Sequence, residues 1–374
     1  MNILLVGAGG YATTYIGELL ENTDPDVKWV GVVDPYIENS AAKDKIYEAK
    51  IPVYADMDAF YREQTADLVL IVTPPFLHRA QSICALSHGS YVLCEKPVAP
   101  TVTEAREMLA AEAQYGKFIA VGYQWSYCDE IQSLKRDVLD GTLGAPVSLK
   151  TLISWPRNRA YYARGGGWGG RISKDGVTVL DSVASNACAH YLHNMLFVLG
   201  DAMETSAAPE TVTAQLYRAN DIENFDTCAI KMGMKGGAEL LFIASHVGKQ
   251  SYEPEFEYVF ENAVVRYCEG DPNGEIVAYF KDGRTKSYGR PRNHTLKKAW
   301  DCVRAIKEGT RPVCTVATAI EHTRVIDRLW REFEIKNFDS ALIREDTADN
   351  RVYVEGLYEK MLAAYEKGTL MSEL

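Results

Sequence analysis

Residues 3–12 read Ile-Leu-Leu-Val-Gly-Ala-Gly-Gly-Tyr-Ala, a short apolar run that breaks into glycines and leads into a helix-compatible segment. This order predicts a buried strand, a tight turn and a helix. The first glycine permits the turn, the second lets the backbone approach a pyrophosphate, and the alanine is small where the helix packs on the strand. Phosphates of a dinucleotide are expected on the amide groups that begin this helix. The residues assigned to this contact are Gly7, Gly9, Gly10, Tyr11 and Ala12.

A second apolar run, residues 27–33, ends at Asp34. An acid at this place accepts hydrogen bonds from the adenosine ribose hydroxyls and repels the additional phosphate of NADP. No lysine or arginine lies between Asp34 and Lys43 to compensate, so the sequence favours NAD over NADP. The alternative is that Asp34 serves only as a cap or turn residue beside Pro35.

Composition indicates a two-domain globular protein. A chain of 374 residues exceeds what one core usually spans, and 47% apolar with 24% charged residues is ordinary. The net charge of −11 disfavours nucleic acid and anionic membranes as partners. No apolar run reaches the ~18 residues of a membrane span, and the first residues resemble a strand rather than a leader, so we expect a cytoplasmic protein. The eight cysteines form no Cys-x-x-Cys pair and are expected to be reduced, and no metal-ligand spacing occurs.

Strand and helix patterns alternate up to residue 122, which is typical of a parallel sheet with crossover helices. The apolar run 66–73 stops at Thr73 and Pro74, and the run 91–94 leads directly into Glu95-Lys96-Pro97. Ligands of such sheets lie at the carboxyl ends of the strands, so both corners are expected near the cofactor. The proline after Lys96 restricts the backbone and partly fixes the direction of the lysine. The alternative for Lys96 is an ion pair with Glu95 or another acid.

Three motifs together resemble one known family. They are the Gly-x-Gly-x-x-Ala turn, the Thr-Pro-Pro strand end with His78, and Glu95-Lys96-Pro97. This set is similar to the family of glucose–fructose oxidoreductase, inositol dehydrogenase and the rhizopine-catabolism dehydrogenases (Gfo/Idh/MocA). The resemblance implies an α/β Rossmann domain over residues 1–122 that binds a nicotinamide dinucleotide. It further implies an α+β domain over residues 123–374, with a large open, mainly antiparallel sheet that carries the substrate site.

Two further expectations follow from the same resemblance. Gln124 belongs to the stretch that looks like the crossover between the domains, and we expect it near the cofactor. His78 is expected to support the site rather than to act in catalysis.

Beyond Ala145 the pattern itself changes to short strands joined by turns. Residues 256–260 and 263–267 flank Glu261-Asn262 as a hairpin, and Asp282-Gly283 predicts another turn. A sheet covered on one side leaves an apolar face that monomers rarely expose, so a homodimer or homotetramer through the sheet is expected. Helices are expected over 296–306, 316–333 and 352–365.

The second chemical centre is the stretch 181–193. Asn186, His190 and His193 are spaced as on one helix face, so their polar groups can converge. Family members usually carry an aspartate four residues before the histidine, whereas this chain has Asn186. Either Asp181 supplies the missing carboxylate, or the site lacks one. The alternatives are a core histidine for His190 and a helix cap for Asp181.

The loop of residues 155–176 is basic in an acidic protein. It holds six glycines and one acid against five basic residues, Arg157, Arg159, Arg164, Arg171 and Lys174. We expect Tyr161, Tyr162 and Trp168 to stack on a sugar ring while an arginine of the loop, such as Arg164, holds a carboxylate or phosphate. The alternative is a subunit contact or a solvated loop.

The chemistry assigned to these residues is hydride transfer at a secondary hydroxyl, which requires a partner for the hydroxyl proton. His190 suits this role because histidine has an ordinary pKa of about 6.5, and Lys96 would stabilise the developing alkoxide, although the two roles could be exchanged. Asp181, Asn186 and His193 are assigned to substrate hydroxyls. The sequence thus indicates an NAD-dependent oxidoreductase acting on a sugar, sugar derivative or cyclitol. A glycosidase with retained NAD and an inactive NAD-binding regulatory protein are the alternatives.

Overall fold

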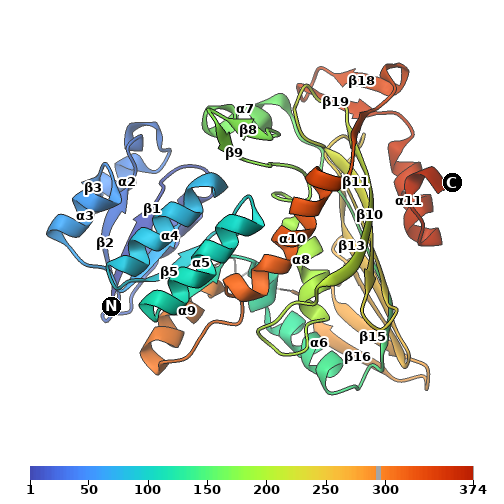
Figure 1. Ribbon diagram of the computed structural model, residues 1–374, viewed down its shortest axis with the longest axis horizontal. Coiled ribbons are helices and arrows are strands. Elements are labelled where there is room, and N and C mark those ends of the chain that lie inside the picture. The colour runs from blue at the N-terminus through green and yellow to red at the C-terminus, as the bar shows by residue number, and fades with distance from the viewer. Residues whose placement is uncertain (292–295, 374) are drawn as a thin grey trace. The chain divides into compact units, whose positions relative to one another are not determined.

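The computed structural model describes residues 1–291 and 296–373 (Figure 1). The chain forms two compact units, and each is described by itself. The first comprises Met1–Tyr127 and His294–Ile320, and the second comprises Cys128–Asn293 and Glu321–Leu374.

The first unit is built on a six-stranded parallel sheet in the order β3-β2-β1-β4-β5-β6. This is the Rossmann strand order, and it confirms the predicted fold class. The strands are β1 (Asn2–Val6), β2 (Lys28–Val33), β3 (Val53–Tyr54), β4 (Leu68–Ile71), β5 (Tyr91–Cys94) and β6 (Ile119–Val121). The helices between them are α1 (Ala12–Glu21), η1 (Ile37–Asn39), α2 (Lys43–Glu48), α3 (Met57–Glu63), η2 (Pro75–Leu77), α4 (His78–Ser87) and α5 (Val102–Tyr115), and η3 (Gln124–Tyr127) follows the last strand.

A late segment of the chain completes this unit. Helix α9 (Lys297–Glu308) buries Ala299, Cys302 and Val303 in the same apolar core as Tyr15 and Leu70. From the sequence, all of residues 123–374 are expected in the second domain, whereas this helix packs in the first unit. Its apolar stripe shows an amphipathic helix but does not show which core the stripe enters. A functional boundary near residue 122 stays a prediction.

The second unit contains a nine-stranded mixed sheet in the order β16-β15-β14-β13-β7-β12-β11-β10-β17. The pairs β7–β12 and β10–β17 are parallel, and the other neighbours are antiparallel. The strands are β7 (Pro146–Ser154), β10 (Pro209–Arg218), β11 (Thr227–Met234), β12 (Glu239–Ser245), β13 (Tyr252–Phe260), β14 (Ala263–Cys268), β15 (Ile276–Phe280), β16 (Thr285–Gly289) and β17 (Ile335–Asn337). The hairpins predicted at Glu261-Asn262 and Asp282-Gly283 are confirmed.

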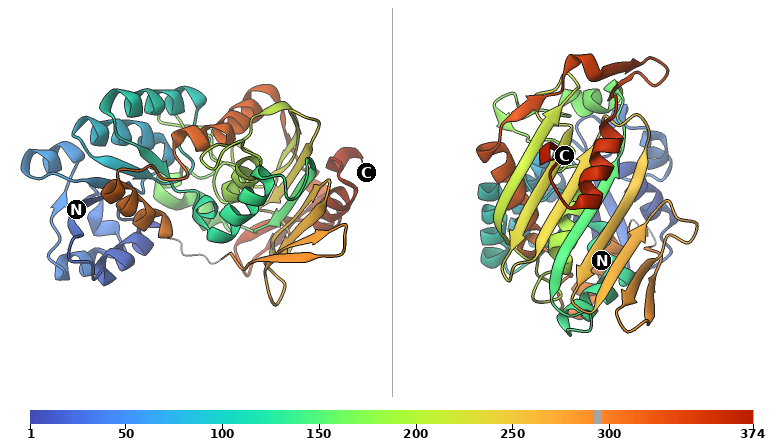
Figure 2. Two further views of the ribbon diagram at one scale, coloured as in Figure 1. Left: turned by 90° about the horizontal axis from the view of Figure 1, so that it is seen from below. Right: turned by 90° about the vertical axis from the view of Figure 1, so that its right-hand side faces the viewer.

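Helices lie on both faces of this sheet. Helices α6 (Asp129–Leu139) and α8 (Ala189–Val198) lie on one side, and α11 (Leu357–Lys367) lies across the other (Figures 1 and 2). Met361 and Ala364 of α11 pack in one core with Leu152, Leu241 and Ile243. Beside this helix, Lys150 and Arg266 pair with Glu257 at 3.0 and 2.9 Å. The face that we expected to be uncovered and apolar therefore carries a helix and an ion-pair network.

The carboxyl-terminal helix begins later than predicted. Residues Arg351–Val354 form β19, which pairs with β18 (Ile343–Asp346), so the start expected at Val352 is wrong. Val352 and Val354 alternate inward, as a strand requires, and Gly356 takes a φ of 71° before α11. The remaining elements are α7 (Arg159–Gly167), β8 (Ser173–Lys174), β9 (Val177–Thr178), α10 (Val316–Glu332), η4 (Ser340–Leu342) and η5 (Met371–Glu373). Among the described residues, no helix has the length and apolarity of a membrane span.

Candidate cofactor and substrate sites

The glycine turn after β1 has the geometry that a pyrophosphate needs. Gly7 has a φ of +92°, and a Cβ on it would lie 2.9 Å from the Val72 carbonyl oxygen. A Cβ on Gly9 or Gly10 would meet nothing within 4 Å. Within the described chain, the amides of Gly9, Gly10 and Tyr11 donate no hydrogen bond to another residue. An open turn with unused amides at a helix N-terminus fits a dinucleotide phosphate. Ala12 is buried behind the turn, where α1 begins.

Asp34 is fixed at the end of β2 beside this turn. Its carboxylate accepts hydrogen bonds from the backbone amides of Ala8 and Tyr36, each at 2.8 Å. The residue is half-buried, and two bonds leave lone pairs on both oxygens for ribose hydroxyls. The turn role and the ribose role weighed from the sequence are thus compatible in one side chain.

His78 connects the turns that follow β4 and β5. Its Nδ1 lies 2.9 Å from the Pro97 carbonyl oxygen, and its Nε2 lies 2.9 Å from the Thr73 carbonyl oxygen. The ring is 1% exposed, and burial lowers its pKa, although the two carbonyl oxygens oppose that shift. Thr73 in turn donates to Gln81 at 2.5 Å. His78 therefore holds the backbone beside Pro74 and Lys96 in place.

Glu95 forms a buried ion pair that the sequence analysis did not anticipate. Its Oε1 accepts from the Tyr15 hydroxyl at 2.7 Å and from Lys298 Nζ, and its Oε2 accepts from the Lys96 amide at 3.2 Å. Lys298 is 1% exposed and also donates to the Gly122 carbonyl oxygen at 3.2 Å. Burial raises the pKa of Glu95, but the charge of Lys298 and the hydrogen bonds outweigh burial, so the pKa lies below its ordinary value.

The pair explains two features of the Glu95-Lys96 corner. A Cβ on Gly122 would lie 2.8 Å from the Glu95 carboxylate, so the end of β6 requires glycine there. Lys298 neutralises the Glu95 charge, and the charge of Lys96 also lowers the pKa of Glu95, so an interaction between Glu95 and Lys96 stays a prediction. A lysine in the first turn of α9 is unfavourable for the helix dipole, which is the one local signal that could have pointed to Lys298. Lys96 and Gln124 are both half-buried.

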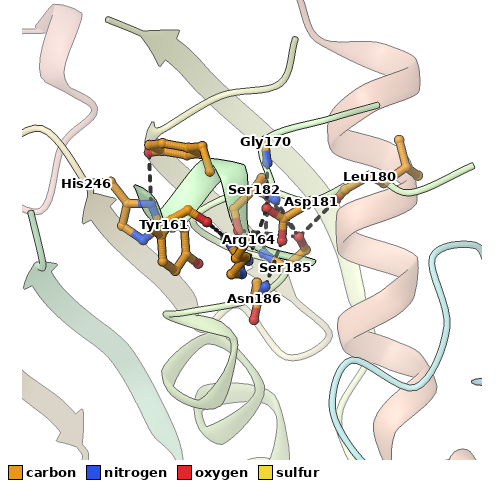
Figure 3. Close-up of polar contacts among 10 residues, drawn as sticks. Tyr161, Arg164, Gly170, Leu180, Asp181, Ser182, Ser185, Asn186 and His246 are labelled. Carbon is orange, nitrogen blue, oxygen red and sulfur yellow. Dashed lines mark hydrogen bonds and ion pairs between the residues drawn. The ribbon is translucent and has the colours of Figure 1, made fainter. Parts of the chain in front are cut away.

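In the second unit, Asp181 organises the glycine-rich loop (Figure 3). Its carboxylate accepts from the Gly170 amide at 2.7 Å and from Asn186 Nδ2 at 2.8 Å, and it lies 3.5 Å from Arg164 Nη2. Asp181 is 5% exposed, so its carboxylate binds the protein itself on several sides. Its assignment to a substrate hydroxyl stays a prediction.

The helical face that we expected is shorter than predicted. Helix α8 begins at Ala189, so Asn186 lies in the turn before the helix and not on it. His190 occupies the first turn of α8 and is half-buried. His193 is fully buried and stacks on Phe197 at 5.9 Å between ring centroids. Burial, followed by the charges of His322 and Lys135, lowers the pKa of His193 well below its ordinary value. Asn186 and His190 are therefore more accessible than His193.

The aromatic residues of the loop contact arginine side chains. The Arg164 guanidinium lies 3.7 Å from the Tyr161 ring centroid and 4.3 Å from that of Trp168. Trp168 is 8% exposed, so most of its surface is covered within the protein. The Tyr162 hydroxyl lies 3.4 Å from His246 Nδ1, and burial raises the pKa of Tyr162. His246, which directly follows β12, is a buried polar residue that the sequence analysis missed.

Comparison with known proteins agrees with this architecture. A family model described as an oxidoreductase family with an NAD-binding Rossmann fold, GFO_IDH_MocA, matches residues 1–123. Over these residues, about a third of the chain, the protein matches the Gfo/Idh/MocA family. The resemblance stated from the sequence motifs is thereby confirmed.

Curated relatives match over the same part of the chain. The D-glucoside 3-dehydrogenase of Escherichia coli is 28% identical over 144 residues, 38% of this chain and 40% of that protein. An inositol 2-dehydrogenase of Klebsiella pneumoniae is 30% identical over 122 residues, 32% of this chain and 36% of that protein. A 2,7-anhydro-N-acetylneuraminate hydratase of Mediterraneibacter gnavus is 27% identical over 140 residues, 37% of this chain and 36% of that protein. These matches thus span well under half of each relative.

Solved structures match nearly the whole chain. An oxidoreductase from Agrobacterium radiobacter, in complex with NAD+, L-tartaric acid and magnesium, has a TM-score of 0.72 at 16% identity, covering 96% of this chain and 99% of that one. The WlbA dehydrogenase of Bordetella pertussis, in complex with NADH and UDP-GlcNAcA, has a TM-score of 0.71 at 20% identity, covering 88% and 95%. At these identities the likeness shows that the fold is shared across both units.

Proposed function

We propose that this protein is an NAD-dependent oxidoreductase that interconverts a secondary hydroxyl and a ketone on a sugar, sugar derivative or cyclitol. The observation that carries the proposal is the carboxyl edge of the parallel sheet. There an open glycine turn, Asp34 and a braced Glu95-Lys96 corner follow β1, β2 and β5. The family match to an NAD-binding Rossmann fold and the dehydrogenases among the relatives support it.

The cofactor contacts follow from the first unit. The amides of Gly9, Gly10 and Tyr11 would bind the pyrophosphate and Asp34 the adenosine ribose. The end of β4, with Thr73 and Pro74, and Gln124 would line the nicotinamide end. A bound nicotinamide dinucleotide supplies the hydride acceptor or donor. Because Asp34 would repel an additional phosphate, we propose NAD rather than NADP.

Transfer of the substrate's hydroxyl proton is assigned to residues of this chain. Lys96, an ammonium on a fixed corner, would stabilise negative charge on the reacting oxygen. His190 would accept the hydroxyl proton during oxidation and return it during reduction, since imidazole titrates near neutral pH. Asn186 and Asp181 would orient the substrate beside His190. Tyr162, Arg164, Trp168 and His193 are the further candidates, of which His193 and Trp168 are too buried to offer much surface.

The experiment is a spectrophotometric assay of NADH formation with a panel of sugars, sugar acids, inositols and glycosides, each with NAD and with NADP. The proposal expects stoichiometric NADH from at least one hydroxyl substrate, faster with NAD. Release of an aglycone from a glycoside without net NADH would instead support a glycosidase that retains its cofactor. The absence of either reaction, with NAD bound, would support a regulatory protein.

Assembly and location are also proposals. We propose a cytoplasmic homodimer or homotetramer that forms through the large sheet. Because α11 and the Lys150–Glu257–Arg266 network occupy part of that face, the contact would be more polar than expected from the sequence. Sedimentation of the purified protein measures the assembly directly.

A further inference from the structure

The basic side chains of residues 155–176 differ in how the protein itself neutralises them. Four of them contact protein oxygen atoms: Arg159 with Glu345 at 2.7 Å, Arg164 with Asp181 at 3.5 Å, Arg171 with Glu223 at 2.7 Å, and Lys174 with the Gly166 carbonyl. Arg157 is the exception. Its side chain makes no ion pair or hydrogen bond with any residue in the described part of the chain, and its Nε is buried without an acceptor.

Arg157 is nevertheless held in place. Its backbone amide donates to the His246 carbonyl oxygen at 3.0 Å, which anchors it beside the end of β12. Its guanidinium lies 5.1 Å from the Tyr161 ring centroid and 5.8 Å from that of Trp155. Aromatic rings orient a guanidinium without neutralising its charge. A half-buried cation with no counterion in the protein remains available to an anionic group of a ligand.

A second buried polar group lies at the same place. His246 is 2% exposed, its ring centroid lies 5.4 Å from that of Tyr161, and its Nε2 has no hydrogen-bond partner among the described residues. Burial, and then the charges of Arg157 and Arg164, lower the pKa of His246 well below its ordinary value, so the ring is neutral. A Tyr162 hydroxyl that donates to Nδ1 leaves the proton on Nε2, which makes Nε2 a donor for a ligand.

The neighbouring carboxylates are already engaged. Asp226 accepts from the backbone amides of Ala219 and Asn220, each at 3.0 Å, and burial raises its pKa. Glu253 accepts from Trp155 Nε1 at 3.0 Å and from Ser251 at 3.0 Å. Asp181 is bound by Gly170, Asn186 and Arg164. No acid of the described chain takes the Arg157 guanidinium.

We propose that Arg157, with Tyr161 and His246, forms a subsite for a carboxylate carried by the sugar substrate, which makes an acidic sugar such as a uronic acid the preferred substrate class. This inference rests on the proposed function and narrows it. One guanidinium matches a carboxylate in charge and in its two-pronged geometry, and one neutral imidazole adds a single further donor. The adjacent tyrosine ring offers a face to the sugar.

The kinetic test compares acidic sugars with their neutral counterparts. D-Glucuronate with D-glucose and D-galacturonate with D-galactose are the pairs, and the protein is assayed as wild type, Arg157→Gln and the control Arg171→Gln. The acidic member of at least one pair is expected to have a kcat/KM about 10-fold or more above its neutral partner. Arg157→Gln should lower kcat/KM for that acid about 100-fold and for the neutral sugar less than about 3-fold. Arg171→Gln should change neither, because its guanidinium pairs with an exposed protein acid.

A binding test separates this inference from the proposed function. The same acids are titrated calorimetrically into wild type and Arg157→Gln in the presence of NAD. Loss of acid binding in the variant, even with no NADH formed from any sugar, upholds the subsite while the proposed activity fails. NADH formed from neutral sugars without preference for acids, and unchanged by Arg157→Gln, overturns the subsite while the activity stands. If Arg157→Gln dissociates an oligomer but keeps the preference for acidic sugars, Arg157 forms a subunit contact, and the subsite is overturned.

Discussion

Two ion-pair clusters, around Glu95 in the first unit and around Asp181 in the second, each hold a buried carboxylate, but their cations differ in burial. Glu95 pairs with a lysine whose side chain is 1% exposed, and the lysine comes from a helix far along the chain. Asp181 pairs with Arg164, whose side chain is 27% exposed and which belongs to the preceding loop. The first cluster fixes a strand end, whereas the second gathers a glycine-rich loop. Under the proposed function, the first cluster serves the cofactor and the second serves the substrate.

Replacing Lys96, which lies next to the Glu95 cluster, should have the largest effect on activity. We expect Lys96→Met to lower kcat by about 10³-fold, because a positioned charge at a developing oxyanion contributes on that order. Its thermal stability should remain close to wild type, since Lys96 is half-buried and Glu95 keeps Lys298. NADH formation with the best substrate measures the rate. Lys45→Met, at an exposed position of the same unit, is the control, and an equal loss there would contradict a specific role.

Breaking the pair of Glu95 and Lys298 should have the largest effect on stability. Lys298→Met leaves the Glu95 carboxylate buried without its cation, and we expect the free energy of unfolding to fall by about 3–5 kcal/mol. Urea unfolding measures this loss. The double variant Glu95→Gln with Lys298→Met removes both charges and should recover most of it. If the single and double variants were equally unstable, the charge pair would not be the cause.

Acid should weaken the second unit through its buried histidines. The fold depresses the pKa of His193 and His246, so the unfolded chain binds more protons below about pH 6.5 and stability falls as the pH decreases. Each histidine should contribute a loss of about 2 kcal/mol between about pH 7 and about pH 5. The free energy of unfolding against pH should therefore be flatter in His193→Leu. His88→Gln, at an exposed position, should keep the wild-type slope, and an unchanged slope in His193→Leu would contradict this origin.

Asp34 tests the choice of cofactor at the same sheet edge. Asp34→Ser removes the charge that would repel the additional phosphate of NADP, and we expect the preference for NAD to fall by about 10-fold. The ratio of kcat/KM for the two cofactors measures it. A ratio unchanged from wild type would mean that Asp34 only stabilises the turn, through its hydrogen bonds from Ala8 and Tyr36.

Breaking the pair of Asp181 and Arg164 should have the smallest effect on the free energy of unfolding. Arg164→Met removes a cation whose side chain is 27% exposed, and the buried Asp181 carboxylate keeps its hydrogen bonds from Gly170 and Asn186, so the loss of stability should be about 1 kcal/mol. Urea unfolding beside Lys298→Met gives the contrast directly. Equal losses in the two variants would erase the distinction between the clusters.

Local signals account for what could be predicted from the sequence. The glycine turn, Asp34 and the Glu95-Lys96 corner each follow an apolar run, and the carboxyl ends of parallel strands share one edge of the sheet. The hairpins at Glu261-Asn262 and Asp282-Gly283 carry their turns in their own residues. These features need no knowledge of distant parts of the chain.

The rest depends on long-range packing. A lysine in the first turn of α9 is unusual but does not indicate that Lys298 enters the core beside Glu95, and an amphipathic helix does not specify which core it joins. Two alternating valines, Val352 and Val354, are too short a pattern to predict a strand before a helix, and the strand forms because β18 provides its partner. The same holds for the aromatic residues of the loop, because only the fold shows that Trp168 covers Arg164.

The proposed function requires that Lys96 and His190 act on the same substrate oxygen. A crystal structure with NAD and the best substrate from the assay measures this directly. The account predicts that Lys96 Nζ and a ring nitrogen of His190 both lie about 2.6–3.2 Å from the hydroxyl or ketone oxygen that faces the nicotinamide. A bound substrate whose reacting oxygen contacts neither side chain would contradict it.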